Sequence, residues 1–142
     1  MTTNKFIIST LAFFVLFCIT NLIWYTYFFP FQDTAAREER LMTAVLPGAL
    51  IASFMFSYLY GQLAKGGNKV QEGFKQGLTL GTFMYLPLFL IFYGTRDTMP
   101  LAAWLMNAAF HIIQFGILGI VIAYIRGTVT SAEAKIEERL PA

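Results

Sequence analysis

The chain has 142 residues, of which 57% are hydrophobic and only 13% are charged. A soluble domain usually carries about 25% charged residues, so this composition argues against a soluble protein and indicates an integral membrane protein, with one domain over residues 1–142. The formal net charge of +2 comes from scattered side chains, with no basic run of the kind that binds nucleic acid.

Four apolar segments are long enough to cross a bilayer, which takes about 20 helical residues. We expect spans at about 6–29, 44–64, 74–93 and 101–125. The first is longer than the core of a secretion signal and has no small-residue cleavage site at its end, so we expect it to be retained. The sequence therefore predicts an all-α fold, a bundle of four transmembrane helices.

Aromatic residues and a proline mark the end of the first span. Trp24, Tyr25 and Tyr27 precede Phe28, Phe29 and Pro30, a combination typical of the membrane interface followed by a helix stop. The polar connection at 31–43 has Asp33 or Thr34 as a possible N-cap, which favours a short surface helix.

Small residues recur at every fourth position in the second and third spans. These positions are Ala49, Ser53, Ser57 and Gly61 in the second span, and Gly73, Gly77 and Gly81 at the start of the third. Such spacing lets two helix backbones approach closely in a membrane. With the short connection at 65–72, it predicts a tight antiparallel hairpin of spans two and three. The alternative use of the same glycines is homodimerisation.

The fourth span carries three polar side chains on one helical stripe. Asn107, His111 and Gln114 follow at spacings of four and three, with Trp104 one turn earlier. Lipid offers no hydrogen-bond partners, so we expect the stripe to face other helices or a cavity. Beyond this span, Thr130 and Glu133 fit a capping box and predict a short C-terminal helix.

The distribution of Lys and Arg predicts the orientation. Seven of them lie at the N-terminus, in the second connection and after the fourth span, and three lie on the opposite side. Because basic residues accumulate in cytoplasmic loops, both termini are expected in the cytoplasm.

With this topology, several polar and aromatic side chains fall in the outer half of the membrane or near its middle. They define a candidate polar cavity between the helices: Asn21, Trp24, Ser53, Tyr85, Trp104, Asn107, His111 and Gln114. The competing interpretation is that these groups only hydrogen-bond across helices and hold the bundle together.

The residue types give little support to enzymatic chemistry. His111 is the only histidine and Cys18 the only cysteine, so we expect no metal site, no cofactor and no catalytic residues. A haem shared between two subunits, with one histidine from each, remains an alternative.

Three stretches of the sequence resemble a family. They are Asn-Leu-Ile-Trp-Tyr at 21–25, the glycine-spaced run at 72–81, and the segment at 104–119 that contains Asn107 and His111. They are similar to small bacterial four-helix membrane proteins grouped only as a domain of unknown function. The resemblance implies a location in the bacterial inner membrane and a topology, but no activity. In that family the position of Asn107 is acidic, so a proton-coupled role does not carry over.

These observations favour a non-enzymatic protein that binds a ligand or lipid, or serves as an accessory subunit of a membrane complex. The alternative is a small transporter or pore that acts as an oligomer, although ion-driven carriers usually need an embedded carboxylate or lysine. Expected partners are membrane lipids, a small apolar ligand, and a second copy or larger membrane complex.

Overall fold

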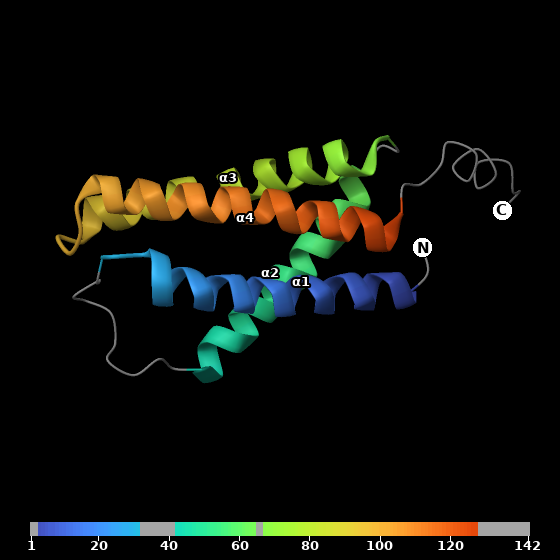
Figure 1. The fold of residues 1–142 in the computed structure, drawn as a ribbon, viewed down its shortest axis with the longest axis horizontal. Helices are drawn as coiled ribbons and strands as arrows, with labels where there is room; N and C mark the ends of the chain where they lie inside the picture. The colour runs from blue at the N-terminus through green and yellow to red at the C-terminus, as the bar shows by residue number, and fades with distance from the viewer. Residues whose placement is uncertain (1–2, 32–41, 65–66, 128–142) are drawn as a thin grey trace, which may run out of the picture.

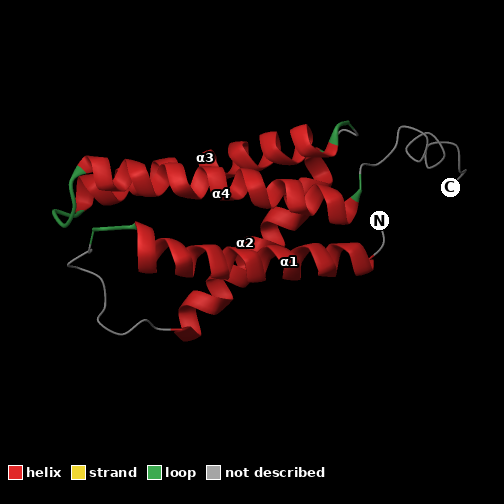
Figure 2. Cartoon of the chain, viewed as in Figure 1, coloured by secondary structure: helices red, strands yellow, loops and turns green. Residues whose placement is uncertain are grey.

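The computed structural model describes residues 3–31, 42–64 and 67–127, and all regular structure within them is helical. The helices are α1 (Thr3–Ile23), continued by the π-helical turn η1 (Trp24–Phe28), then α2 (Met42–Leu63), α3 (Lys69–Thr95) and α4 (Leu101–Arg126) (Figures 1 and 2). Four helices are long and apolar enough to cross a membrane, which confirms the predicted all-α bundle of four spans. The short helices expected near 31–43 and after residue 128 lie outside the described residues.

Helix boundaries lie close to the predicted ones, except at the start of α3. That helix begins at Lys69 because Asn68 caps it: the Oδ1 atom accepts hydrogen bonds from the backbone nitrogens of Val70 at 3.0 Å and Gln71 at 3.3 Å. The helix then continues through Pro87 to Thr95.

Helices α3 and α4 form the closest pair and lie side by side along their length (Figure 1). A Cβ atom built on Gly73 would lie 2.5 Å from the carbonyl oxygen of Gly119, and one on Gly81 would lie 3.0 Å from the Cα of Ile112. Gly77 meets the Phe115 carbonyl in the same way. The glycines of α3 therefore bring two backbones into contact, but the partner is α4.

The predicted hairpin of spans two and three is thus wrong. The small surface that matches the α3 glycines belongs to Gly116 and Gly119 of α4, whose own Cβ positions are blocked by α3. The α3 glycines, which the homodimer alternative would also use, are buried against α4 within the chain.

Helix α2 crosses the other helices obliquely and packs mainly on α1 (Figure 1). Its small residues Ala49, Ser53 and Ser57 are buried, as expected of packing positions, and the Ser57 Oγ lies 3.3 Å from the Oγ of Ser9. Gly61 has another role: a Cβ there would lie 2.6 Å from the guanidinium group of Arg126. That guanidinium donates a hydrogen bond to the carbonyl of Ser57, so Arg126 ties the end of α4 to α2.

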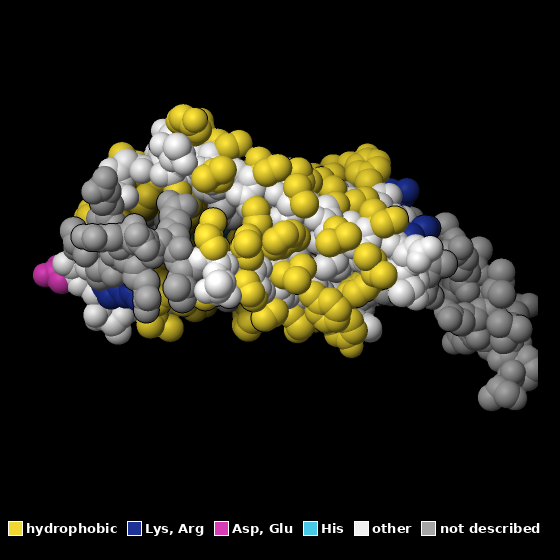
Figure 3. All heavy atoms as spheres, turned by 90° about the horizontal axis from the view of Figure 1, so that it is seen from below, with side chains coloured by type: hydrophobic (Ala, Val, Ile, Leu, Met, Phe, Trp, Pro, Cys, Tyr) yellow, Lys and Arg dark blue, Asp and Glu magenta, His cyan; other side chains and the backbone are white. Residues whose placement is uncertain are grey.

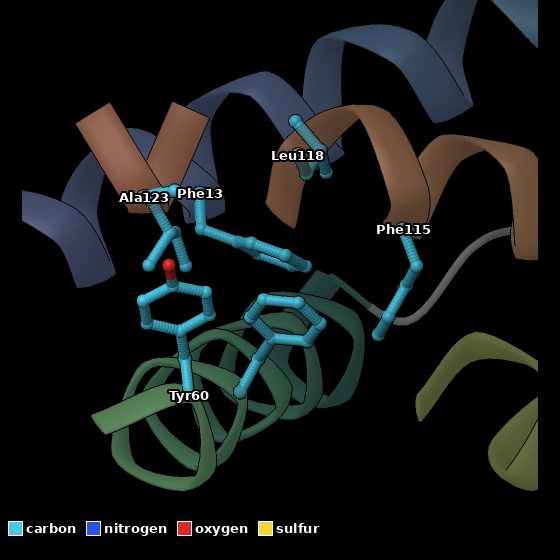
Figure 4. Close-up of a cluster of buried hydrophobic side chains, with 7 residues drawn as sticks. Phe13, Tyr60, Phe115, Leu118 and Ala123 are labelled. Atoms are coloured by element: carbon cyan, nitrogen blue, oxygen red, sulfur yellow. The ribbon is translucent and has the colours of Figure 1, made fainter. Parts of the chain in front are cut away.

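An aromatic cluster joins α1, α2 and α4 at the centre of the bundle (Figure 4). Phe13 stacks on Phe56 at 4.6 Å between ring centroids and meets Phe115 edge-on at 5.2 Å. Tyr60 lies against the same group. Such edge-to-face and offset contacts stabilise a core beyond the burial of apolar area alone.

The outer surface of the bundle is apolar between two polar ends. In the face shown in Figure 3, hydrophobic side chains cover the middle, and the charged side chains in view lie towards the ends. This is the distribution expected of a lipid-facing surface. The guanidinium of Arg126 lies 5.7 Å from the ring of Phe6, so the start of α1 and the end of α4 share one end of the bundle.

Candidate functional site

The polar stripe of α4 faces α1 and is buried. Asn107, His111 and Gln114 expose only 4%, 3% and 5% of their surface. Their partners come from the last turns of α1 and from η1, namely Thr20, Trp24 and Tyr25. We call these six side chains the polar seam.

At the η1 end of the seam, Asn107 is the central group. The indole Nε1 of Trp24 donates to its Oδ1 at 2.9 Å, and its Nδ2 donates to the hydroxyl oxygen of Tyr25 at 3.0 Å. That hydroxyl lies 3.2 Å from the Nε2 of His111 and also 3.2 Å from the Asn107 Oδ1. Asn107 and His111 are therefore linked through one tyrosine hydroxyl.

Towards the middle of the bundle, the seam continues from His111 to the backbone of α1. The Nδ1 of His111 lies 2.9 Å from the Oε1 of Gln114, and the Gln114 Nε2 donates to the hydroxyl of Thr20. Thr20 in turn donates to the carbonyl of Leu16 at 2.7 Å. The seam thus ends on a backbone acceptor within α1.

The donor and acceptor of each hydrogen bond in the seam can be assigned from the groups at its two ends, the indole N–H of Trp24 and the backbone carbonyl of Leu16. Because the Gln114 nitrogen donates to Thr20, its oxygen must accept, so the proton of a neutral His111 ring is on Nδ1. Nε2 is then an acceptor, and its one neighbouring donor in the seam is the hydroxyl of Tyr25. The Tyr25 hydroxyl therefore has two acceptors at 3.2 Å, the Nε2 of His111 and the Oδ1 of Asn107, which also accepts from Trp24. When it donates to His111, the seam forms a one-way series of hydrogen bonds from Trp24 to the carbonyl of Leu16.

Two consecutive residues of the π-helical turn bond the same amide, Trp24 at its Oδ1 and Tyr25 at its Nδ2. In an α-helix, neighbouring side chains point about 100° apart, and so they address different partners. In η1 the backbone nitrogen of Phe29 bonds the carbonyl of Trp24 at 2.9 Å, five residues apart, which widens the turn. Trp24 and Tyr25 both bond Asn107 in this arrangement.

Aromatic rings enclose the seam on the side of α3 and α4. The ring of Tyr85 stacks on His111 at 4.2 Å between centroids and 10° between planes, with Phe89 behind it at 5.8 Å from His111. Phe110 stacks on Trp24 at 4.2 Å and 2°. These contacts hold the imidazole and indole rings in fixed orientations.

Of the residues selected from the sequence, Trp24, Tyr85, Asn107, His111 and Gln114 come together at the seam. The other three lie apart from its hydrogen bonds. The Nδ2 of Asn21 and the Oγ of Ser53 donate to carbonyls within their own helices, and the Trp104 ring packs against α3 with its Nε1 buried and without a hydrogen-bond partner among the described residues.

Sequence reasoning missed Tyr25 and Thr20. Tyr25 was assigned to the interfacial belt of aromatic residues, and a lone threonine in an apolar helix usually bonds its own backbone. Thr20 and Trp24 are four residues apart and therefore lie on the same face of α1. This spacing could have predicted a polar face on α1.

No group of three or more His, Cys, Asp and Glu side chains that could hold a metal gathers in the part of the chain that the structure describes. A surface pocket does occur at the connection of α3 and α4, lined by Tyr93, Gly94, Thr95, Arg96, Asp97 and Met99. The seam side chains instead bond one another.

Comparison of the chain with protein-family models, with curated proteins and with solved structures finds no match.

Proposed function

We propose that this chain is a non-enzymatic membrane protein that binds a small, mostly apolar ligand or a lipid at the η1 end of the polar seam. It acts alone or as an accessory subunit of a larger membrane complex, in a bacterial inner membrane with both termini in the cytoplasm. The observation that carries the proposal is the position of Tyr25, which bonds the buried pair Asn107 and His111 while 37% of its own surface is exposed.

In this arrangement the exposed side chain of Tyr25 connects a buried polar pair with the surface of the bundle. The amide of Asn107 and the imidazole of His111 recognise hydrogen-bonding groups with defined direction, and the rings of Tyr85, Phe89 and Phe110 supply an apolar wall. Ligand sites in membrane bundles combine these two features: a mostly apolar surround and a few oriented polar groups.

The composition of the seam supports binding over ion-driven transport. It consists of amide, hydroxyl and indole groups and one imidazole, and contains no carboxylate or lysine. Coupled carriers and proton relays generally use such charged groups within the membrane. The transporter or pore alternative therefore gains no specific support from the seam.

The test is native mass spectrometry of the gently solubilised protein. We expect a bound small molecule or lipid that is retained by the wild type and by Ser53→Ala, a buried control whose hydroxyl bonds only its own helix. His111→Ala and Asn107→Ala should lose it while keeping their helical circular dichroism. Retention of the same molecule by both seam variants would place the binding site elsewhere. A wild-type protein without any bound molecule would indicate that the seam only holds α1 and α4 together.

A further inference from the structure

We propose that the ligand of the polar seam is an amphiphile with a free hydroxyl group, an alcohol or phenol on an apolar body. Its hydroxyl takes the place of the Tyr25 hydroxyl between Asn107 and His111. This inference rests on the proposed function, because it names the chemical class that the same site accepts.

The seam defines what the group between Asn107 and His111 must do. It accepts a hydrogen bond from the Asn107 Nδ2, now made at 3.0 Å, and it donates towards the His111 Nε2 and the Asn107 Oδ1, each now at 3.2 Å. An ether or ketone oxygen accepts but cannot donate, and an ammonium group donates but cannot accept. A hydroxyl does both through a single atom, as the phenol of Tyr25 does.

Tyr25 is the member of the seam that can leave. Its side chain is 37% exposed, whereas Asn107 and His111 are 4% and 3% exposed and bonded on both sides. It lies in the π-helical turn, and the backbone leaves the helix at Phe29, which has φ −88° and ψ 104°. Rotating this one side chain outward leaves the rest of the seam in place.

An amphiphile can reach the vacated position from the lipid. The side chains of Leu22, Tyr27 and Phe28, which flank Tyr25, are 59%, 79% and 64% exposed. On its other side the imidazole of His111 is covered by the stacked ring of Tyr85, so the Nε2 edge is the one that faces η1. The apolar body then remains against the aromatic residues of η1 and in the acyl chains.

The test uses Tyr25→Phe, which removes the competing hydroxyl but keeps the ring. Protein in nanodiscs of phosphatidylcholine, a lipid without hydroxyl groups, is titrated with 4-octylphenol and with its methyl ether 4-octylanisole. Without a probe, Tyr25→Phe should unfold at a lower temperature than the wild type, since Asn107 and His111 lose a partner. With the phenol it should bind about tenfold more tightly than the wild type, because a hydrogen-bonded competitor is gone.

The ether and a neighbouring tyrosine provide the controls. The anisole should bind at least about tenfold more weakly than the phenol to both proteins, because it cannot donate to His111. Tyr27→Phe, in the same turn and 79% exposed, should leave phenol affinity unchanged.

Equal affinities for phenol and ether, no binding of either probe, or Tyr25→Phe binding the phenol no better than the wild type would each overturn the inference. A copurified ligand without a hydroxyl, lost in His111→Ala, would overturn it as well but leave the proposed function intact. A wild-type protein that retains no bound molecule in native mass spectrometry would contradict the proposed function itself, and this inference with it.

Discussion

Replacing Gly73 by alanine tests the closest backbone contact of the fold. The new Cβ would lie 2.5 Å from the Gly119 carbonyl oxygen and 2.8 Å from the Ile120 Cα, whereas ordinary contacts begin at 3.4 Å. Both neighbours are backbone atoms of α4, so no side-chain rotation relieves the clash. The two helices must separate by roughly 1 Å, which forfeits up to about half of the dispersion attraction between facing atoms.

The expected cost follows from two opposing effects. Overpacking of this kind destabilises by about 1–3 kcal/mol, while Gly→Ala in a helix gains up to about 1 kcal/mol. The matched control is Gly94→Ala in the same helix, where a Cβ meets nothing within 4 Å and only the gain applies. The gain is common to both variants, so we expect them to differ by the overpacking cost alone, about 2 kcal/mol, or roughly 7 °C in the unfolding midpoint of a chain this size.

Thermal unfolding in detergent, followed by tryptophan fluorescence, gives the comparison directly. Trp24 and Trp104 are suitable reporters, because both pack on side chains of neighbouring helices. A Gly73→Ala midpoint equal to that of Gly94→Ala would refute the close pairing of α3 and α4.

Three further experiments test other contacts of the bundle. Asn107→Ala should lower the free energy of unfolding by about 1–3 kcal/mol, because two interhelical hydrogen bonds are lost; an unchanged midpoint would contradict the seam. Arg126→Ala should destabilise by about 1 kcal/mol, because its bond to α2 is lost; Gly61→Ala should be near neutral, because displacement of the Arg126 guanidinium offsets the helix gain of up to about 1 kcal/mol. In the Arg126→Ala background Gly61→Ala should stabilise, and additive effects in this double-mutant cycle would argue against the contact. The Oγ atoms of Ser9 and Ser57 lie 3.3 Å apart. Cysteines that replace these two serines, in a variant without the native Cys18, should therefore form a disulfide on mild oxidation. Failure to form it would argue that α2 does not pack on α1.

The sequence alone determined that this is a helical membrane protein and where its spans run. Span length is a local property: about 20 apolar residues and their flanking signals, such as Pro30 after η1, stand in consecutive positions of the sequence. The stripe of Asn107, His111 and Gln114 was visible for the same reason, since helical spacing places them on one face.

Only the tertiary structure decided which helices meet. Small residues at regular spacing show that a helix can be approached closely, but not by which neighbour, and four mutually apolar helices in lipid offer several pairings of similar energy. In the structure, Gly116 and Gly119 of α4 pack against the glycines of α3. The small residues of α2 are contacted instead by Ser9 of α1 and Arg126 of α4.

The partners of the polar stripe were likewise decided in three dimensions. Tyr25 follows Trp24 directly, and ideal helical geometry would send the two side chains in different directions. Both side chains nevertheless lie in the π-helical turn and bond different atoms of one amide, the Oδ1 and the Nδ2 of Asn107. Sequence periodicity therefore located the buried amide and imidazole, and the packing of two helices selected the hydroxyl that joins them.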